Sequence, residues 1–377
     1  FLSYCQTPIS KLLLMALTIF YIVSWIGDYE FQKILGESLS EAEFSRISGF
    51  VSIFENIGLV LILIFVQQRV FKSAGVLNTL SSTPFILVIP FVVLLFFPFP
   101  FVVGSLLLVS NIINYSFFSN SIRLIFTVIP NGIRSSAMTF VGGNSDSIAM
   151  LIAGISLALL NRFLTNIFVI ILAIVLLLFL LVIIFYMKGE YVKQIIKNLE
   201  SNDKEDLHSA IENFAERGYH SVGVKELMKL IQWKTLDSET VRKIIFSLGK
   251  IDNVHVIPGL LEMFERYDSS VKYAVVEAIH SFSRLNERLR DLSFTRLNII
   301  EVYEKFFLEE ENSELKVFIL QNLKDFDPDQ IIIFLKNAIA SKNPAISYQA
   351  IKAMKYFNDR GIVKYVKPFL DHQDLMM

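Results

Sequence analysis

Four polar side chains stand inside long apolar stretches of this sequence: Glu55, Asn111, Asn114 and Asp146. A carboxylate in the hydrocarbon core of a bilayer is costly unless it is paired or hydrated, so such residues commonly mark the path of a solute or an ion. We therefore predict that these four residues bind a substrate or couple its transport to an ion. The alternative is that each one hydrogen-bonds to a neighbouring helix and only stabilises packing.

Charged residues that follow the first apolar stretch form a second set of candidates. Asp28 and Glu30 come after an uncharged segment at 12–26, so we predict that they lie near the outer end of a membrane helix, at an external mouth. Lys33 stands three residues after Glu30. A plain interfacial ion pair between these two side chains is therefore the alternative.

Hydropathy places all of these residues in a membrane domain. The chain has 377 residues, 53% of them hydrophobic, and a mean hydropathy of +0.53, which is too apolar for a soluble globular protein. Because about 20 apolar residues cross the hydrocarbon as a helix, we predict six spans, at about 9–33, 46–70, 83–98, 100–122, 136–160 and 165–187. The third span is short, begins at Pro84 and contains Pro90. The segment 98–100 is predicted to be a tight turn, because proline cannot continue a helix.

The distribution of lysine and arginine predicts the orientation of these spans. More Lys and Arg residues lie in the loops at 1–11, 67–78 and 120–135 and in the segment from 188 onward than in the opposite loops. Such loops stay in the cytoplasm. Arg123 and Arg134 are therefore predicted at the inner mouth, where they either gate the path or reach lipid phosphates as anchors. The four apolar-stretch candidates then share a depth near the midplane on three helices, where transporters bind their substrates.

A change in composition near 188–200 divides the chain, because charges of both signs recur every few residues only after Lys188. We predict an all-α protein with a membrane domain at 1–190 and a cytoplasmic domain at 191–377. The expected location is a bacterial inner membrane. Because the sequence begins with Phe1, we expect it to be an N-terminally truncated fragment.

Helix-period segments repeat within the second domain. Four copies begin at Ser238, Ser269, Ser313 and Pro344, each with a polar helix start, an apolar-striped helix, a short turn and a second helix. The starts are 31, 44 and 31 residues apart, and the segment 286–297 explains the longer interval as a lengthened loop. A weaker copy lies upstream, within 205–231. Helical pairs with a fixed period are typical of α-solenoids, which present a long concave surface to protein partners.

The sequence contains no motif for an enzyme, a cofactor or a metal. The five histidines are scattered and none has a partner at metal-ligand spacing, and the single cysteine, Cys5, excludes an intramolecular disulfide and a cysteine-based zinc site. No phosphate-binding loop, dinucleotide fingerprint or nucleophile elbow is present. We therefore predict a protein that is not an enzyme and has no cofactor. No nucleic-acid partner is expected either, because no segment is sufficiently basic.

Several stretches resemble a known transporter family. With six spans and a cytoplasmic continuation, the first domain looks like the C-terminal half of a major facilitator superfamily transporter, whose twelve spans form two six-span halves. DYEFQKIL (28–35), FVQQRVFKSAGVLNTL (65–80) and RLIFTVIPNGIRSSAMTFVGG (123–143) resemble the ATP/ADP translocase-like branch. Bacterial members of that group carry HEAT repeats, which 203–372 resembles. The resemblance implies a nucleotide-like or other anionic solute. The midplane groups here are acidic or neutral, whereas the nucleotide exchangers carry basic residues facing the substrate.

These observations favour one function and leave two alternatives. We predict membrane transport of a small solute by a facilitator-type secondary transporter, with a HEAT-repeat domain for regulation or partner docking. Its partners would be the lipid bilayer, a small-molecule or ion substrate, and a protein on the solenoid. The first alternative is a membrane-anchored scaffold or sensor that does not transport. The second is a complete six-span protein that dimerises into a twelve-span assembly.

Overall fold

The computed structural model describes residues 7–163, 166–215, 220–233, 236–251, 256–286, 299–325 and 328–354, and every regular element among them is a helix. Contacts divide the chain into a first unit, Phe1–Gly218, and a second unit, Tyr219–Met377. This division lies after the composition change near residue 190. The reason is that the last membrane helix continues to Leu199 and a short polar helix then packs against it within the first unit.

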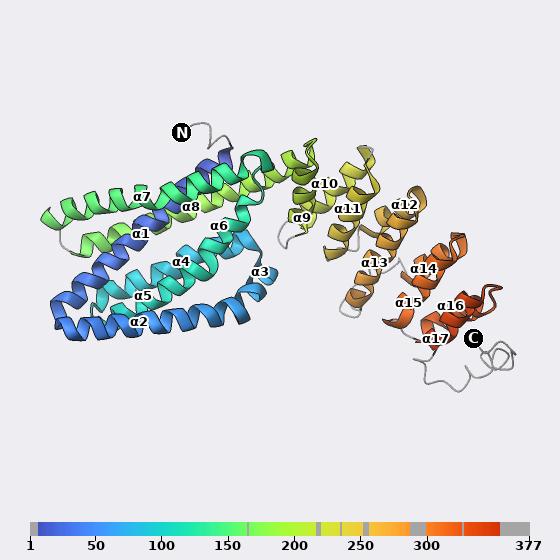
Figure 1. The fold of residues 1–377 in the computed structure, drawn as a ribbon, viewed down its shortest axis with the longest axis horizontal. Coiled ribbons are helices and arrows are strands. Elements are labelled where there is room, and N and C mark those ends of the chain that lie inside the picture. Colours follow the sequence, from blue (N-terminus) through green and yellow to red (C-terminus); the bar gives the residue numbers. More distant parts are fainter. Residues whose placement is uncertain are drawn as a thin grey trace. The chain divides into compact units, whose positions relative to one another are not determined.

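Six helices of the first unit are long and apolar enough to cross a membrane, so the chain is a membrane protein (Figure 1). The helices of this unit are α1 (Pro8–Ser38), α2 (Glu41–Ile62) with η1 (Leu63–Gln67) and α3 (Gln68–Ala74), α4 (Val76–Phe96), α5 (Pro100–Ile113) with η2 (Asn114–Phe118) and α6 (Ser119–Phe126), α7 (Asn131–Phe163), α8 (Asn166–Leu199) and α9 (Lys204–Phe214). η1 and η2 are single π-helical turns inside otherwise α-helical spans.

The third span differs from the prediction of a short helix that begins at Pro84. α4 begins at Val76, directly after Gly75, whose φ of 79° allows the chain to turn there in a single residue. Pro84 and Pro90 both lie inside this helix. A hydroxyl group next to Pro84 forms a hydrogen bond with the preceding helical turn: Thr83 Oγ1 donates to the Thr79 carbonyl at 3.1 Å. Neighbouring hydroxyls are one reason why membrane helices tolerate proline. The predicted turn at 98–100 is confirmed, since α5 begins at Pro100.

α1 packs mainly against α7 and α8, and it also contacts α5. Its buried stripe is mostly apolar, with Leu13, Ala16, Ile26 and Leu35 each 0% exposed. α2 differs, because none of its residues, all of which the structure describes, is buried. Part of the apolar surface of α2, including Ile53, Phe54 and Ile57 at 55%, 59% and 52% exposed, therefore lies uncovered within this chain, a surface that suits lipid or another protein.

The second unit consists of shorter amphipathic helices that pair along the sequence (Figure 1). They are α10 (His220–Trp233), α11 (Ser238–Lys250), α12 (Ile257–Arg266), α13 (Ser269–Asn286), α14 (Ile299–Glu309), α15 (Ser313–Gln321) with η4 (Asn322–Asp325), α16 (Pro328–Ile339) and α17 (Pro344–Met354). The first helices of successive copies contact one another, α11 with α13, α13 with α15, and α15 with α17. The predicted long loop at 286–297 lies almost wholly outside the described residues, as does the second helix of the last copy.

Polar helix starts connect neighbouring copies of the second unit. Asp268 accepts hydrogen bonds from the amides of Ser270 (3.0 Å) and Val271 (3.2 Å), and its other oxygen accepts from the Ser238 hydroxyl of the preceding copy at 2.8 Å. Asn343 has the equivalent role in the last copy, since its side-chain nitrogen donates to the Ser313 hydroxyl at 2.8 Å. Each capping side chain thus accepts backbone amides at the start of its own helix and also forms a hydrogen bond with the copy before it.

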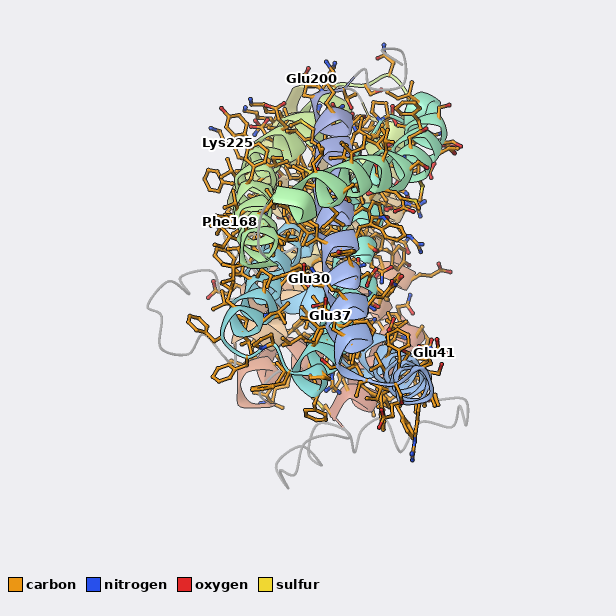
Figure 2. All side chains as sticks on the ribbon, turned by 90° about the vertical axis from the view of Figure 1, so that its left-hand side faces the viewer. Glu30, Glu37, Glu41, Phe168, Glu200 and Lys225 are labelled. Atoms are coloured by element: carbon orange, nitrogen blue, oxygen red, sulfur yellow. The ribbon has the colours of Figure 1, made fainter. Side chains whose placement is uncertain are left out.

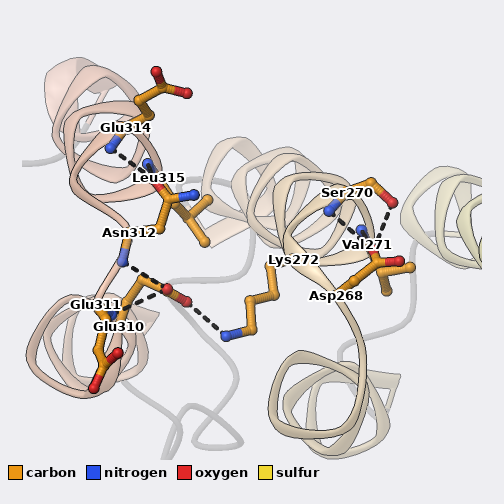
Figure 3. A network of polar contacts seen from close by, with 9 residues as sticks. All are labelled: Asp268, Ser270, Val271, Lys272, Glu310, Glu311, Asn312, Glu314 and Leu315. Atoms are coloured by element: carbon orange, nitrogen blue, oxygen red, sulfur yellow. Dashed lines mark hydrogen bonds and ion pairs between the residues drawn. The ribbon is translucent and has the colours of Figure 1, made fainter.

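The copies that begin at Ser269 and Ser313 are joined by an ion pair instead (Figure 3). Lys272 Nζ lies 2.7 Å from Glu310 Oε2. The other oxygen of Glu310 accepts the amides of Glu311 at 3.0 Å and Asn312 at 2.9 Å. Glu310 belongs to the acidic run Glu309–Glu311, but its side chain is only 6% exposed.

Candidate functional site

A cavity of about 60 Å³, part of it open to the surroundings, lies between α1, α4 and the α5–η2 helix. Its walls are mostly apolar. Five polar side chains also line it, namely Ser24, Asp28, Ser110, Asn111 and Asn114. A mostly apolar pocket with a few convergent polar groups is the usual form of a small-molecule site. Two of the predicted midplane residues, Asn111 and Asn114, therefore share a cavity with Asp28, which the sequence placed at the outer mouth.

Glu55 joins this cluster from α2. Asn111 Nδ2 donates to Glu55 Oε2 at 3.1 Å, so one residue that lines the cavity is bonded to the carboxylate on the neighbouring helix. Close helix packing makes this contact possible. A Cβ atom added to Gly58, one turn after Glu55, would lie 2.6 Å from Ile112 Cδ1. Glycine therefore lets α2 approach α5 at the depth where the two polar groups meet.

Asp146, on α7, does not line this cavity and is hydrogen-bonded to α1 instead. Trp25 Nε1 donates to Asp146 Oδ1 at 3.1 Å, and the carboxylate is exposed. α7 continues without a break through Gly142 and Gly143, and a Cβ atom at either glycine would meet no described atom within 4 Å. Gly142 and Gly143 therefore do not pack closely against any other helix among the described residues.

The two π-helical turns face each other next to the cavity. Gln67, at the end of η1, donates its side-chain amide to the Ser116 carbonyl in η2 at 2.8 Å. Asn114 is the first residue of η2, is 8% exposed, and accepts a hydrogen bond from the Ser119 hydroxyl at 3.2 Å. π-Helical turns frequently occur at functional sites, because they free backbone carbonyls and reorient side chains.

Glu30 lies away from this cavity, on the buried side of α1. It is 0% exposed, and neither carboxylate oxygen accepts a hydrogen bond from any residue that the structure describes. Figure 2 labels it on α1, together with Glu37 on the same helix and Glu41 at the start of α2, both of which are exposed. The ammonium group of Lys33 lies 5.9 Å from the ring centre of Tyr29. The sequence suggested that Glu30 forms an ion pair with Lys33 at the membrane surface, but the carboxyl group of Glu30 is buried.

The two predicted inner-mouth arginines have different surroundings. Arg123, on α6, is exposed. Arg134 bends back over the segment between α6 and α7, where its Nε donates to the Ile129 carbonyl at 2.9 Å and its Nη2 to the Thr127 carbonyl at 2.8 Å. Arg134 thus holds the connection between two membrane helices.

Sequence reasoning missed the polar partners that complete these contacts. Ser24, Ser110, Trp25 and Gln67 are uncharged and attracted no attention in an apolar background. One available signal was the spacing of Ser24 and Asp28, four residues apart and hence on one helix face.

Among the described residues, no group of three or more His, Cys, Asp or Glu side chains could hold a metal ion. No family model, no curated protein and no solved structure matched this chain.

Proposed function

We propose that the first unit carries a small solute across a membrane as part of a facilitator-type secondary transporter. The observation that carries this proposal is the convergence of Asp28, Asn111 and Asn114 on one cavity between membrane helices, with the Glu55 carboxylate hydrogen-bonded to Asn111. Packing alone does not need two carboxyl groups and two amides at one place, since each costs free energy in an apolar surrounding. A solute or ion that exchanges hydrogen bonds with them would offset that cost.

The uncovered surface of α7 supports the idea that this unit is one half of a larger assembly. Asp146, Gly142 and Gly143 are exposed on a helix that is long and apolar enough to cross a membrane. A carboxylate does not face lipid tails, and small residues with nothing against them are the usual contact surface of a further helix. α2, with no buried residue in its fully described length, offers a second uncovered surface. We propose that a second six-helix half, as in the major facilitator superfamily, covers these surfaces.

Transport would then follow from rocking of the two halves around the cavity. Glu55 and Asp146 would bind the coupling ion or an ionised group of the solute. Asn111 would orient the Glu55 carboxylate through its 3.1 Å hydrogen bond. Asp28 and Asn114 would contact the solute from α1 and η2.

The second unit is proposed to be a HEAT-type α-solenoid in the cytoplasm. What supports this is the chain of contacts from α11 through α13 and α15 to α17, and the recurrence of a capping Asp or Asn bonded to a serine 30 residues earlier. Such stacking of neighbouring copies is the physical basis of solenoids.

Uptake of radiolabelled solutes into proteoliposomes tests the proposal. The full-length protein should accumulate at least one solute, with anionic and nucleotide-like compounds tested first. Glu55→Gln combined with Asp146→Asn should abolish or strongly reduce that uptake. Glu37→Gln combined with Glu212→Gln is the matched control, because these exposed carboxyl groups lie outside the site. Uptake that is unchanged by the Glu55 and Asp146 pair for every transported solute would exclude their coupling role.

A second function is favoured by exposed apolar side chains on the second unit. Leu308 and Ile333 are 68% and 66% exposed, and Tyr348 is 46% exposed. A scaffold or sensor that binds a protein through this unit, without transport, would use such residues. A stoichiometric partner retained by the full chain, together with no measurable uptake of any solute, would favour this function over transport.

A further inference from the structure

The connection between α6 and α7 has unusually complete polar contacts for so short a segment. Three backbone carbonyl groups of residues 127–130 accept hydrogen bonds from side chains of three different helices. Arg134 of α7 binds the carbonyls of Thr127 and Ile129, and Asn198 of α8 binds that of Val128 at 2.7 Å. Ser209 of α9 donates to the Thr127 carbonyl at 3.1 Å.

α9 also caps the start of α7. Pro130 precedes α7 and has no side-chain oxygen, so it cannot accept the free amides of the first turn. Asp206 of α9 supplies that acceptor instead, since its Oδ1 accepts the Asn131 amide at 2.7 Å. Glu205 accepts a hydrogen bond from the Asn131 side chain as well. Two carboxylates of α9 therefore lie at the positive end of the α7 dipole.

Besides these polar contacts, α9 buries apolar side chains against the first unit. Asp206 is 7% exposed, and Leu207, Ala210 and Ile211 on the same helix are 6%, 0% and 0% exposed. Within α8, Gln194 donates to Asn198 Oδ1 at 2.8 Å, which orients the amide that binds Val128. α9 is thus a docked element of the first unit and not a loose linker.

A movement of the connection between α6 and α7 would shift α6 and, with it, the wall of the cavity. α6 is continuous through η2 with α5, and η2 contributes Asn114 to the cavity wall. Phe118 of η2 stacks on Phe20, a wall residue of α1, with ring centres 3.8 Å apart. An outward shift of α6 would separate these rings and open the cavity on the α6 side.

We propose that α9 is a latch: it holds the connection between α6 and α7 closed, and its release opens the cavity from that end. The proposal rests on the proposed function only in treating the cavity as the solute site. It adds an intramolecular control of access to that site.

Two measurements on the full chain in liposomes test the latch, and neither needs a known solute. The first is hydrogen exchange of the amides at 131–134. The second is the rate at which N-ethylmaleimide alkylates Ser110→Cys, a cavity position, in a Cys5→Ser background. Asp206→Ala and the milder Ser209→Ala should each raise both rates, by roughly fivefold for Asp206→Ala, the factor expected for one capping hydrogen bond. Glu212→Ala, on the exposed side of α9, is the matched control and should change neither rate.

Each other result overturns the proposal in a distinct way. Faster exchange at 131–134 with unchanged alkylation would show that the contact is structural and does not govern access. Unchanged exchange would show that α9 does not hold the connection, and an equal response to Glu212→Ala would show general destabilisation. If no solute is taken up but alkylation responds as predicted, the latch stands and the transport function fails.

Discussion

Replacing Lys272 by methionine should weaken the second unit far more than the same change at Lys305. Both lysines form an ion pair with an N–O distance of 2.7 Å, Lys272 with Glu310 and Lys305 with Glu265. The pairs differ in exposure: 23% and 6% for the side chains of Lys272 and Glu310, against 47% and 55% for those of Lys305 and Glu265. Methionine preserves most of the alkyl packing of lysine and removes the charge.

The size of the expected loss in stability depends on which hydrogen bonds Glu310 keeps in the variant. Its carboxylate keeps the two amide donors of Glu311 and Asn312, so the variant loses one charged hydrogen bond but does not leave the group bare. A hydrogen bond to a charged group contributes about 1.5–3 kcal/mol, and we expect Lys272→Met to lower the free energy of unfolding by about 2 kcal/mol. An exposed pair contributes about 0.2–1 kcal/mol, so Lys305→Met should cost less than about 1 kcal/mol.

The pH dependence provides an independent check. Burial alone would raise the pKa of Glu310, but the hydrogen bonds from Lys272 and from the two amides outweigh it and hold the pKa below its usual value of 4.5. A lowered folded-state pKa means that the carboxylate stabilises the fold above the ordinary pKa and that this contribution is lost as the pH falls through the folded value. The difference between the wild type and Lys272→Met should therefore be full at pH 7 and shrink below pH 4.5.

Urea unfolding of the full chain in detergent, followed by far-ultraviolet circular dichroism, measures this. Membrane helices in micelles resist urea, so the first transition reports the second unit. Equal destabilisation by the Lys272 and Lys305 variants would show that burial does not decide the strength of these ion pairs. A Lys272 effect that does not shrink at all as the pH falls from 7 through the acid transition of the second unit would contradict the role assigned to Glu310.

Three further predictions concern single side chains. Gly249→Ala places a Cβ atom 3.1 Å from the Ala278 backbone, which cannot easily move, so the second unit should lose about 1–3 kcal/mol in the same urea assay; an unchanged transition would contradict that packing. Glu30→Leu replaces a buried carboxyl, whose oxygens accept no hydrogen bond from the described residues, by an apolar group and should raise the thermal stability of the first unit, by about 1–3 kcal/mol. A lower melting temperature would mean that Glu30 has a stabilising partner. Trp25→Phe removes the 3.1 Å hydrogen bond to Asp146 and should lower uptake of any transported solute severalfold while leaving stability within about 1 kcal/mol; unchanged uptake would show that the orientation of Asp146 is immaterial.

Long-range apolar periodicity made the coarse organisation predictable. An uncharged run of about 20 residues has few alternatives to a spanning helix. The third span shows the limit of that reasoning, because Pro84 suggests a helix start although hydroxyl groups let α4 extend back to Val76.

The contacts of the candidate site were much less predictable, since depth along a helix does not determine which way a side chain points. Glu55 and Asn111 were placed at one depth, and they are also hydrogen-bonded. Asp146 was placed at the same depth but is bonded to Trp25 instead. Glu30 lies on the buried side of α1, where the sequence suggested a surface charge. These differences depend on helix rotation and packing, which no local pattern specifies.

If the proposed function is right, the polar groups of α7 and of the cavity line a watery path and do not face lipid. Single cysteines in a Cys5→Ser background of the full-length protein in liposomes test whether these groups face water. A charged, water-soluble thiol reagent should modify Gly143→Cys, next to Asp146 on the uncovered surface of α7, and Ser110→Cys in the cavity. Ile57→Cys, on the exposed apolar surface of α2, should react much more slowly. Equal protection of all three positions from the reagent would contradict the claim.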